Sequence, residues 1–141
     1  MFLISTYLDK SPIHGIGVFA NQFVPKGTKI WEFTPGFDSI FSEEALSTLL
    51  KEQRDIIIFY GYREPKIDQV VLSCDNARHF NFAVNPNTGG NEAMIDDRWG
   101  SYALRDIARG EELTYSVYED LDAFDKLGPA LYLQITQEMA P

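Results

Sequence analysis

Residues 75–87 read Asp75-Asn76-Ala77-Arg78-His79-Phe80-Asn81-Phe82-Ala83-Val84-Asn85-Pro86-Asn87. This segment is too polar for a buried strand and too apolar for a freely solvated loop. Amide side chains that leave water cost free energy unless they are hydrogen-bonded. We therefore expect its asparagines to lie against the core, where they either bond to neighbouring backbone or bind a polar ligand.

A second marked segment, Gly15-Ile16-Gly17-Val18-Phe19-Ala20, formally fits the G-x-G-x-x-A pattern of dinucleotide-binding folds. That pattern requires a buried strand before it and a helix directly after it. Here Ser11-Pro12 precedes the glycines and Pro25-Lys26-Gly27 follows them closely, which disfavours a dinucleotide site. Because the glycines have no Cβ atom, we expect them to form a tight turn or to let the backbone approach a ligand.

Short runs of β-branched and aromatic residues, separated by single Pro and Gly residues, predict many short strands with an antiparallel opening. The predicted strands cover residues 2–8, 18–23, 29–33, 56–60, 70–72, 101–105 and 112–117. Two helical patterns occur at about 42–53 and 120–138. The first has Ser42 as a suitable N-cap and three leucines on one face. The expected fold is mostly β with a small helical part.

The composition describes one acidic domain. The 141 residues suffice for one packed core, and 12 Lys and Arg against 21 Asp and Glu give a net charge of -9. That charge disfavours direct contact with nucleic acid and favours basic partners. Because Cys74 is the single cysteine, neither a disulfide framework nor a thiolate zinc site can form within the chain, and no metal site is expected.

Two further features bear on localisation. The first ten residues lack a basic region before their apolar run, so they do not resemble a signal peptide. No apolar run approaches the roughly 20 residues needed to span a bilayer. We expect a soluble, intracellular protein, in the cytoplasm or the nucleus, without a membrane partner.

Tyrosines form a third candidate site. Five of the seven fall in or near the predicted elements: Tyr60, Tyr62, Tyr102, Tyr115 and Tyr118. Phenol rings can surround an ammonium group by cation–π attraction and orient its nitrogen by hydrogen bonding, although the same rings also serve in core packing. The sequence contains neither G-x-S-x-G nor H-E-x-x-H, the motifs of common serine and zinc hydrolases.

Taken in order, these segments resemble the SET-domain protein methyltransferases over nearly the whole chain. Residues 15–20, followed by the P-x-G turn within residues 24–30, are similar to the opening motif of the family. Residues 75–87 are similar to its signature loop, R-F-x-N-H-S-x-x-P-N. Residues 103–115 are similar to its closing block, whose common form ends G-E-E-L-T-x-D-Y. Three motifs in the correct order are far more specific than any single one.

The resemblance implies a compact, mostly β fold in which the closing block threads under the preceding loop as a pseudoknot. It also implies a pocket for S-adenosylmethionine and, from the opposite face, a narrow channel for the substrate lysine. It divides the chain into a SET core, residues 1–119, and a helical tail, residues 120–141, that closes the cofactor pocket within one domain. Small members of the family can form homodimers, so a homodimer is allowed here.

The resemblance assigns six residues to cofactor binding: Ile16, Gly17, Tyr62, Asn81, Phe82 and Phe124. The first two contribute main-chain contacts to the methionine part of the cofactor. The asparagine and the backbone after it hold the amino group and the adenine, on which the last phenylalanine stacks. Tyr60 is the alternative to Tyr62 as the earlier tyrosine of the pocket.

Two departures from the family pattern concern catalysis. Phe82 and Ala83 stand where the family has His and Ser, which removes a side-chain hydrogen bond from the loop. Ser116-Val117 stands where Asp-Tyr is expected, so the usual catalytic tyrosine is missing in strict register. A one-residue bulge would bring Tyr118 to that place, whereas regular alternation would point it to the other face. Tyr115 keeps its place as a wall residue.

The sequence therefore favours an S-adenosylmethionine-dependent protein-lysine N-methyltransferase that acts on a basic, lysine-containing peptide or protein. Tyr118 and Tyr115 are the expected catalytic residues. One alternative is a SET-fold protein that binds the cofactor or a basic partner with weak or no transfer, because of Val117 and Phe82. Another is an acidic adaptor that only recognises a basic partner. The acidic residues near the C-terminal end form a candidate rim for a lysine-rich substrate, and they would also serve an adaptor that binds a basic partner.

Overall fold

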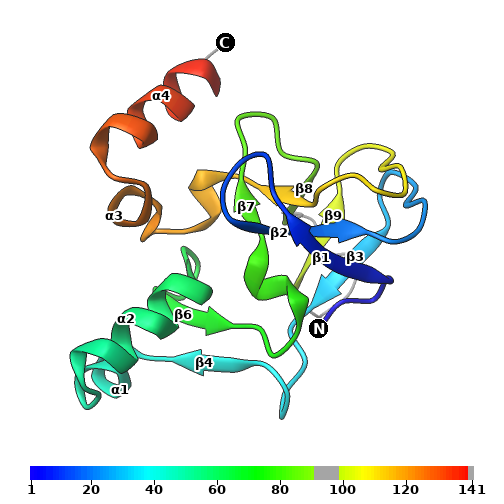
Figure 1. Cartoon of the computed structure of the whole chain (residues 1–141). Helices are drawn as coiled ribbons and strands as arrows, with labels where there is room; N and C mark the ends of the chain where they lie inside the picture. Colours follow the sequence, from blue (N-terminus) through cyan, green and yellow to red (C-terminus); the bar gives the residue numbers. More distant parts are fainter. Residues whose placement is uncertain (91–98, 140–141) are drawn as a thin grey trace.

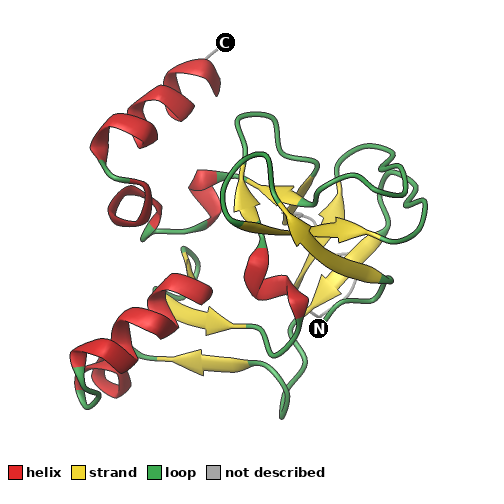
Figure 2. Ribbon diagram, viewed as in Figure 1, coloured by secondary structure: helices red, strands yellow, loops and turns green. Residues whose placement is uncertain are grey.

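The computed structural model describes residues 1–90 and 99–139. Most of the short strands gather in one body, whereas the strands at residues 39–41 and 69–72 lie beside the helical group of residues 43–60 (Figure 1). A second helical group, residues 123–139, extends from the molecule elsewhere. Short strands joined by loops, with few and short helices, dominate the structure (Figure 2), so the predicted fold class is confirmed. None of the described helices is long and apolar enough to cross a bilayer.

The glycine motif forms the turn of a β-hairpin. Strand β1 (Thr6–Lys10) pairs antiparallel with β2 (Ile16–Ala20), although β1 begins later than predicted. Gly15 between them has a φ of 50°, a conformation that residues with a Cβ atom seldom adopt. The Ser11 N–H donates to the Gly15 carbonyl at 2.8 Å and closes the turn. The antiparallel opening is confirmed, and the dinucleotide pattern fails because a strand follows the glycines.

Two three-stranded antiparallel sheets hold most of the remaining strands. The first has the order β3 (Lys29–Glu32), β9 (Gly100–Ala103), β8 (Thr88–Gly90). The second has the order β4 (Ser39–Phe41), β6 (Gln69–Leu72), β5 (Tyr62–Glu64). Fully buried aliphatic side chains join the first sheet and the hairpin into one core: Val18, Val24, Ile30, Val71, Ile107 and Leu113. Burial of each such side chain contributes about 1.5–3 kcal/mol.

The segment 75–87 and the closing block lie side by side. Strand β7 (Asn81–Phe82) pairs in parallel with β10 (Thr114–Tyr115). The Asn87 side chain accepts a hydrogen bond from the Thr114 N–H at 3.0 Å and donates one to the Glu112 carbonyl at 2.8 Å. The expected contact between these two segments is confirmed. The Asn87 amide has the structural role of bonding to neighbouring backbone.

The first predicted helix is wrong in extent. Ser42 caps a helix as expected, because its Oγ accepts from the Ala45 N–H at 3.1 Å. That helix, α1 (Glu43–Ser47), is only five residues long, and a separate helix α2 (Lys51–Tyr60) follows. The strand expected at residues 56–60 is therefore helical. A short apolar run does not distinguish a helix from a strand by its periodicity, and tertiary context overrides strand propensity here.

Gly61 explains where α2 must end. Its N–H donates to the Ile57 carbonyl at 2.8 Å. A Cβ atom at this position would lie 2.6 Å from Val70 Cγ1 and 2.7 Å from the Val71 carbonyl oxygen. Only glycine lets the chain pass this close to β6 and enter β5 directly.

The second predicted helix is divided into three pieces. Strand β10 ends at Tyr115, earlier than predicted, and a 3-10 helix η2 (Val117–Glu119) follows it. Next come α3 (Ala123–Leu127) and α4 (Pro129–Met139). Gly128 between them has a φ of 77°, which interrupts the helix. No residue of α4 is buried, so this helix is not part of the core.

Candidate active site

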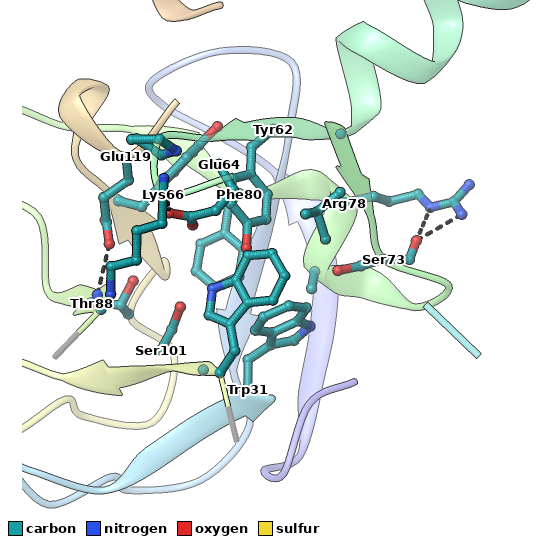
Figure 3. A pocket seen from close by; sticks show the side chains of 18 of the residues that line it. Trp31, Tyr62, Glu64, Lys66, Ser73, Arg78, Phe80, Thr88, Ser101 and Glu119 are labelled. Carbon is teal, nitrogen blue, oxygen red and sulfur yellow. Dashed lines mark hydrogen bonds between the residues drawn. The ribbon is translucent and has the colours of Figure 1, made fainter. Parts of the chain in front are cut away.

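A pocket of about 330 Å³ opens between the two three-stranded sheets and η2 (Figure 3). Volumes of this size are typical of small-molecule or side-chain binding sites. Its walls are mainly aromatic, with contributions from Trp31, Tyr62, Phe80, Trp99, Tyr102 and Tyr115. Its polar groups include two carboxylates and one ammonium: Glu64, Glu119 and Lys66. Such a pocket suits an aliphatic chain with a cationic end.

Three of the wall rings hold one another in place. The centroids of Trp31 and Tyr62 are 6.4 Å apart, those of Trp31 and Trp99 are 6.5 Å apart, and those of Tyr62 and Trp99 are 6.3 Å apart. All three pairs meet edge to face, the arrangement that ring quadrupoles favour. The cluster therefore forms a stiff wall. Sequence reasoning missed both tryptophans, because no local signal tells which face of a strand will line a pocket.

Tyr115 links the pocket to the segment 75–87. Its ring stacks on Phe82 at 4.5 Å with an interplanar angle of 25°, which follows from the parallel register of β7 and β10. It also meets Phe80 at 5.9 Å. Burial and the neighbouring Asp120 and Glu119 raise the pKa of Tyr115 well above its usual value. The phenol is therefore a proton-bearing hydrogen-bond donor at neutral pH.

Tyr62 has the same electrostatic character. Burial raises the pKa of its phenol well above the usual value, and Glu64, Glu119 and Asp120 raise it further. Tyr62 lines the pocket, as does Tyr60 on the preceding helix. Both candidates for the earlier pocket tyrosine are therefore at the pocket. Tyr62 is the one within the aromatic cluster.

A buried carboxylate fixes the chain beyond the closing block. Asp120 has a fully buried side chain, and its Oδ2 accepts from Lys126 Nζ at 2.6 Å and from the Tyr115 hydroxyl at 3.5 Å. Its Oδ1 accepts from the Arg63 N–H at 2.9 Å. Lys126 also donates to the Gly61 carbonyl at 2.6 Å. These bonds tie η2 and α3 to β5 beside the pocket.

Tyr118 lies at the pocket by a route that differs from a β-bulge. The chain leaves the strand after Tyr115, and the Ser116 hydroxyl accepts from the Tyr118 N–H at 3.2 Å to start η2. This turn places Tyr118 in the pocket lining with 59% of its surface exposed. Val117, in the register of the missing tyrosine, is only 2% exposed and belongs to the core.

A separate polar cradle surrounds Asn81. Its Nδ2 donates to the His14 carbonyl at 3.1 Å, the Ile16 carbonyl at 3.3 Å and Glu112 Oε1 at 2.9 Å. A Cβ atom on Gly17 would lie 2.1 Å from that same Glu112 oxygen, so a side chain here would displace the Glu112 carboxylate. Ile16, Gly17 and Asn81 are thus brought together as expected. Glu112, which holds them, was not among the expected site residues, although it lies in the G-E-E-L-T run.

The cradle has the kind of acceptor groups that an ammonium group needs, and in this structure the Asn81 amide occupies them. Two backbone carbonyls and a carboxylate converge on Asn81 Nδ2, and oxygen acceptors of this kind also satisfy an –NH₃⁺ group with its three donors. Asn81 lies between Phe80, which lines the pocket, and Phe82, which stacks on Tyr115. The cradle and the aromatic pocket are therefore linked along the chain through residues 80–82.

Phe124 is the expected site residue that lies apart from the others. It is 47% exposed on α3 and is not among the residues of the pocket lining. Its ring meets Tyr132 of α4 at 5.4 Å, edge to face. Of the other expected residues, Tyr62, Tyr115 and Tyr118 line the pocket, whereas Ile16, Gly17 and Asn81 form the cradle.

Comparisons with known proteins identify the family of this chain. A family model described as SET domain matches residues 15–117. The histone-lysine N-methyltransferase trr of Drosophila melanogaster is 30% identical over 120 residues, which are 84% of this chain and 5% of that protein. The chain thus spans only a small part of this relative.

The solved structures show the same fold. The structure of a candidate histone methyltransferase of Plasmodium falciparum superposes with a TM-score of 0.56 at 20% identity. The match covers 80% of this chain and 92% of that one. At this identity the likeness concerns the fold alone.

Proposed function

This chain belongs to the SET-domain family, and from that premise we propose that it is an S-adenosylmethionine-dependent protein-lysine N-methyltransferase acting on a basic peptide or protein. The observation that carries the proposal is that residues 80–82 connect two sites along the chain, the oxygen-lined cradle around Asn81 and an aromatic pocket of about 330 Å³. One site suits an amino-acid ammonium group and the other suits a lysine side chain.

The cradle is the proposed cofactor site. Main-chain groups of Ile16 and Gly17, with Asn81 and the backbone of Phe82, would hold the methionine part and the adenine. S-Adenosylmethionine supplies a methyl group on a positively charged sulfur. The Glu112 carboxylate supports this site because it holds Asn81 and packs against Gly17. Its charge complements a cationic cofactor.

The tail is the proposed cover of the cofactor site. We divide the chain into a SET core, residues 1–119, and a tail, residues 120–141, within one domain. The exposed ring of Phe124 is available to stack on adenine, and the ion pair between Asp120 and Lys126 holds the start of the tail beside the core. An exposed aromatic ring offers a face for stacking, which supports this role, although in this structure Phe124 packs on Tyr132.

The pocket is the proposed lysine channel. A lysine with an ordinary pKa near 10.4 must lose a proton and align its nitrogen with the methyl group. The aromatic walls hold the aliphatic chain, and exclusion of water from the pocket disfavours the charged form of the amine, which lowers its pKa. Tyr62 and Tyr115 keep their phenol protons and form the walls. We assign the orienting role to Tyr118, which lines the pocket from η2.

A second candidate function rests on Val117. It is buried in the core, and the nearest tyrosine is largely exposed. A SET-fold protein with this arrangement could bind the cofactor or a basic partner and transfer methyl groups weakly or not at all. Calorimetric titration of S-adenosylmethionine and radiolabelled transfer to a synthetic lysine-rich peptide separate the two functions. Binding together with transfer supports the methyltransferase, and binding alone supports the second candidate.

Tyr118→Phe is the variant that tests the catalytic assignment. Removing the hydroxyl should lower kcat by about 10²-fold, the usual size of such contributions, and leave cofactor affinity unchanged. Tyr115→Phe is the matched control, because it removes a phenol from the same pocket, and it should cost much less. Unchanged transfer in Tyr118→Phe would refute the role of Tyr118.

A further inference from the structure

Glu119 presents a carboxylate to the pocket from η2 (Figure 3). Its Oε1 accepts from the Gly90 N–H of β8 at 2.7 Å, and its Oε2 accepts from the Ser116 N–H at 3.4 Å. The second bond completes a capping box with Ser116, which gives an acidic residue a structural reason to stand here. The capping box does not account for the bond to β8 or for the position in the pocket wall.

The carboxylate has unused acceptor capacity and, within the described part of the chain, forms no ion pair. An ionised carboxylate offers about four acceptor sites, and two backbone N–H groups occupy two of them. Among the residues that the structure describes, no cation lies within ion-pair distance of Glu119. A half-buried carboxylate with this deficit is suited to a cationic ligand.

The charged surroundings favour proton exchange at this carboxylate. Burial raises the pKa of Glu119, Glu64 raises it further, and Lys66 together with the two backbone hydrogen bonds opposes the rise. Tyr62 and Tyr115, two phenols that line the same pocket, keep their protons. A general base works best when its pKa lies near the working pH, and burial moves Glu119 in that direction.

We propose that Glu119 is a catalytic residue that accepts the proton of the substrate ammonium group. The proposal rests on the methyltransferase function given above. The substrate R–NH₃⁺ gives one proton to the Glu119 carboxylate, leaving R–NH₂ and a neutral carboxylic acid. The nitrogen lone pair then forms a bond to the methyl carbon, and the carbon–sulfur bond breaks with its electron pair remaining on sulfur. The product is a methylated ammonium ion, and the Glu119 proton passes to water.

This role would compensate for Val117, which stands where the family usually has its catalytic tyrosine. With an aliphatic residue buried in the register of the usual tyrosine, the pocket needs another group to prepare the amine. Glu119 lies two residues later, in the same 3-10 turn that brings Tyr118 to the pocket. One turn thus supplies a phenol to orient the nitrogen and a carboxylate to take its proton.

The test compares two amines in the wild type and in Glu119→Gln. The probes are a synthetic lysine-rich peptide and the same peptide with S-aminoethylcysteine as the target residue, whose amine is less basic. With the lysine peptide, kcat should fall by about 10²-fold or more in Glu119→Gln. With the less basic amine the loss should be clearly smaller, because less of the amine needs a base.

Controls separate this role from a structural one. Glu64→Gln removes the other carboxylate of the pocket, and its effect should not depend on the basicity of the amine. Glu119→Asp keeps a carboxylate and should retain more lysine transfer than Glu119→Gln. Cofactor titration and thermal unfolding check that each variant is folded.

The outcomes are distinguishable. An equal loss with both amines, or no loss, overturns the role of Glu119 while leaving the methyltransferase function intact. Absence of transfer by the wild type with either peptide, at saturating S-adenosylmethionine, overturns both.

Discussion

The closing block ends at Tyr115 and helix α4 begins at Pro129, in the same C-terminal part of the chain, but the two differ in how they are held. In the closing block Leu113 is fully buried and Thr114 is bonded to Asn87. In α4 no residue is buried, and Leu131 and Leu133 are 45% and 53% exposed. The geometry of the pocket therefore depends on interlocked segments before α4. Helix α4 contributes no buried side chain to this geometry.

Leu113→Ala tests this contrast with the largest expected effect. The substitution removes a fully buried side chain at the junction of the hairpin and the closing block. It should lower the free energy of unfolding by about 2–5 kcal/mol. Urea denaturation followed by circular dichroism measures the change.

Leu133→Ala on α4 is the matched control. It should change the free energy of unfolding by less than about 0.5 kcal/mol, because the side chain is already exposed. Comparable losses in the two variants would show that α4 packs as tightly as the closing block, and the contrast would fail.

Asp120→Asn tests whether the ion pair with Lys126 anchors the segment between the closing block and α4. It keeps the shape of the side chain but removes the charge that pairs with Lys126 in a nearly water-free site. We expect a loss of about 2 kcal/mol in unfolding free energy, the usual value for a hydrogen bond between charged groups. Asp125→Asn, on an exposed position of α3, is the control and should be near neutral. A silent Asp120→Asn would mean that the tail is not anchored there.

The smallest expected effect on unfolding free energy concerns His79, which contacts helix α2. Its ring meets Tyr60 of α2 at 5.7 Å. Burial lowers the pKa of His79 and Arg78 lowers it further. The unfolded chain therefore binds a proton more readily than the folded one, so stability should decline as the pH falls below about 6.5.

Unfolding of His79→Gln between about pH 5 and 8 measures this contribution. The variant should lose part of the decline, whereas His14→Gln controls for the removal of a histidine. An identical pH dependence of unfolding in the wild type and His79→Gln would show that His79 does not contribute to it.

Local sequence signals predicted most strands but only part of the candidate site. The glycine hairpin, the caps and the positions of most strands followed from turn residues and β-branched runs, because these act within a few residues. The helical state of residues 56–60 did not follow from local signals, because an Ile-Ile-Ile-Phe run is compatible with either a helix or a strand. The close contact of Gly61 with β6, which fixes the end of the helix, is visible only in the tertiary structure. The tyrosines and Asn81 were found from the motifs. Trp31, Trp99, Glu112 and Glu119 were missed, because their roles depend on partners more than 15 residues away or on another strand.

The sequence by itself determined the family, the mostly β class and the segments that meet at the site. Those properties reside in ordered motifs and in short-range backbone preferences, which are readable along the chain. Only the tertiary structure decided which tyrosines line the pocket and where the residues after Tyr115 lie. A 3-10 turn after Tyr115 buries Val117 and brings Tyr118 and Glu119 to the pocket. The direction of a side chain after a turn depends on packing against distant strands, and no local pattern records it.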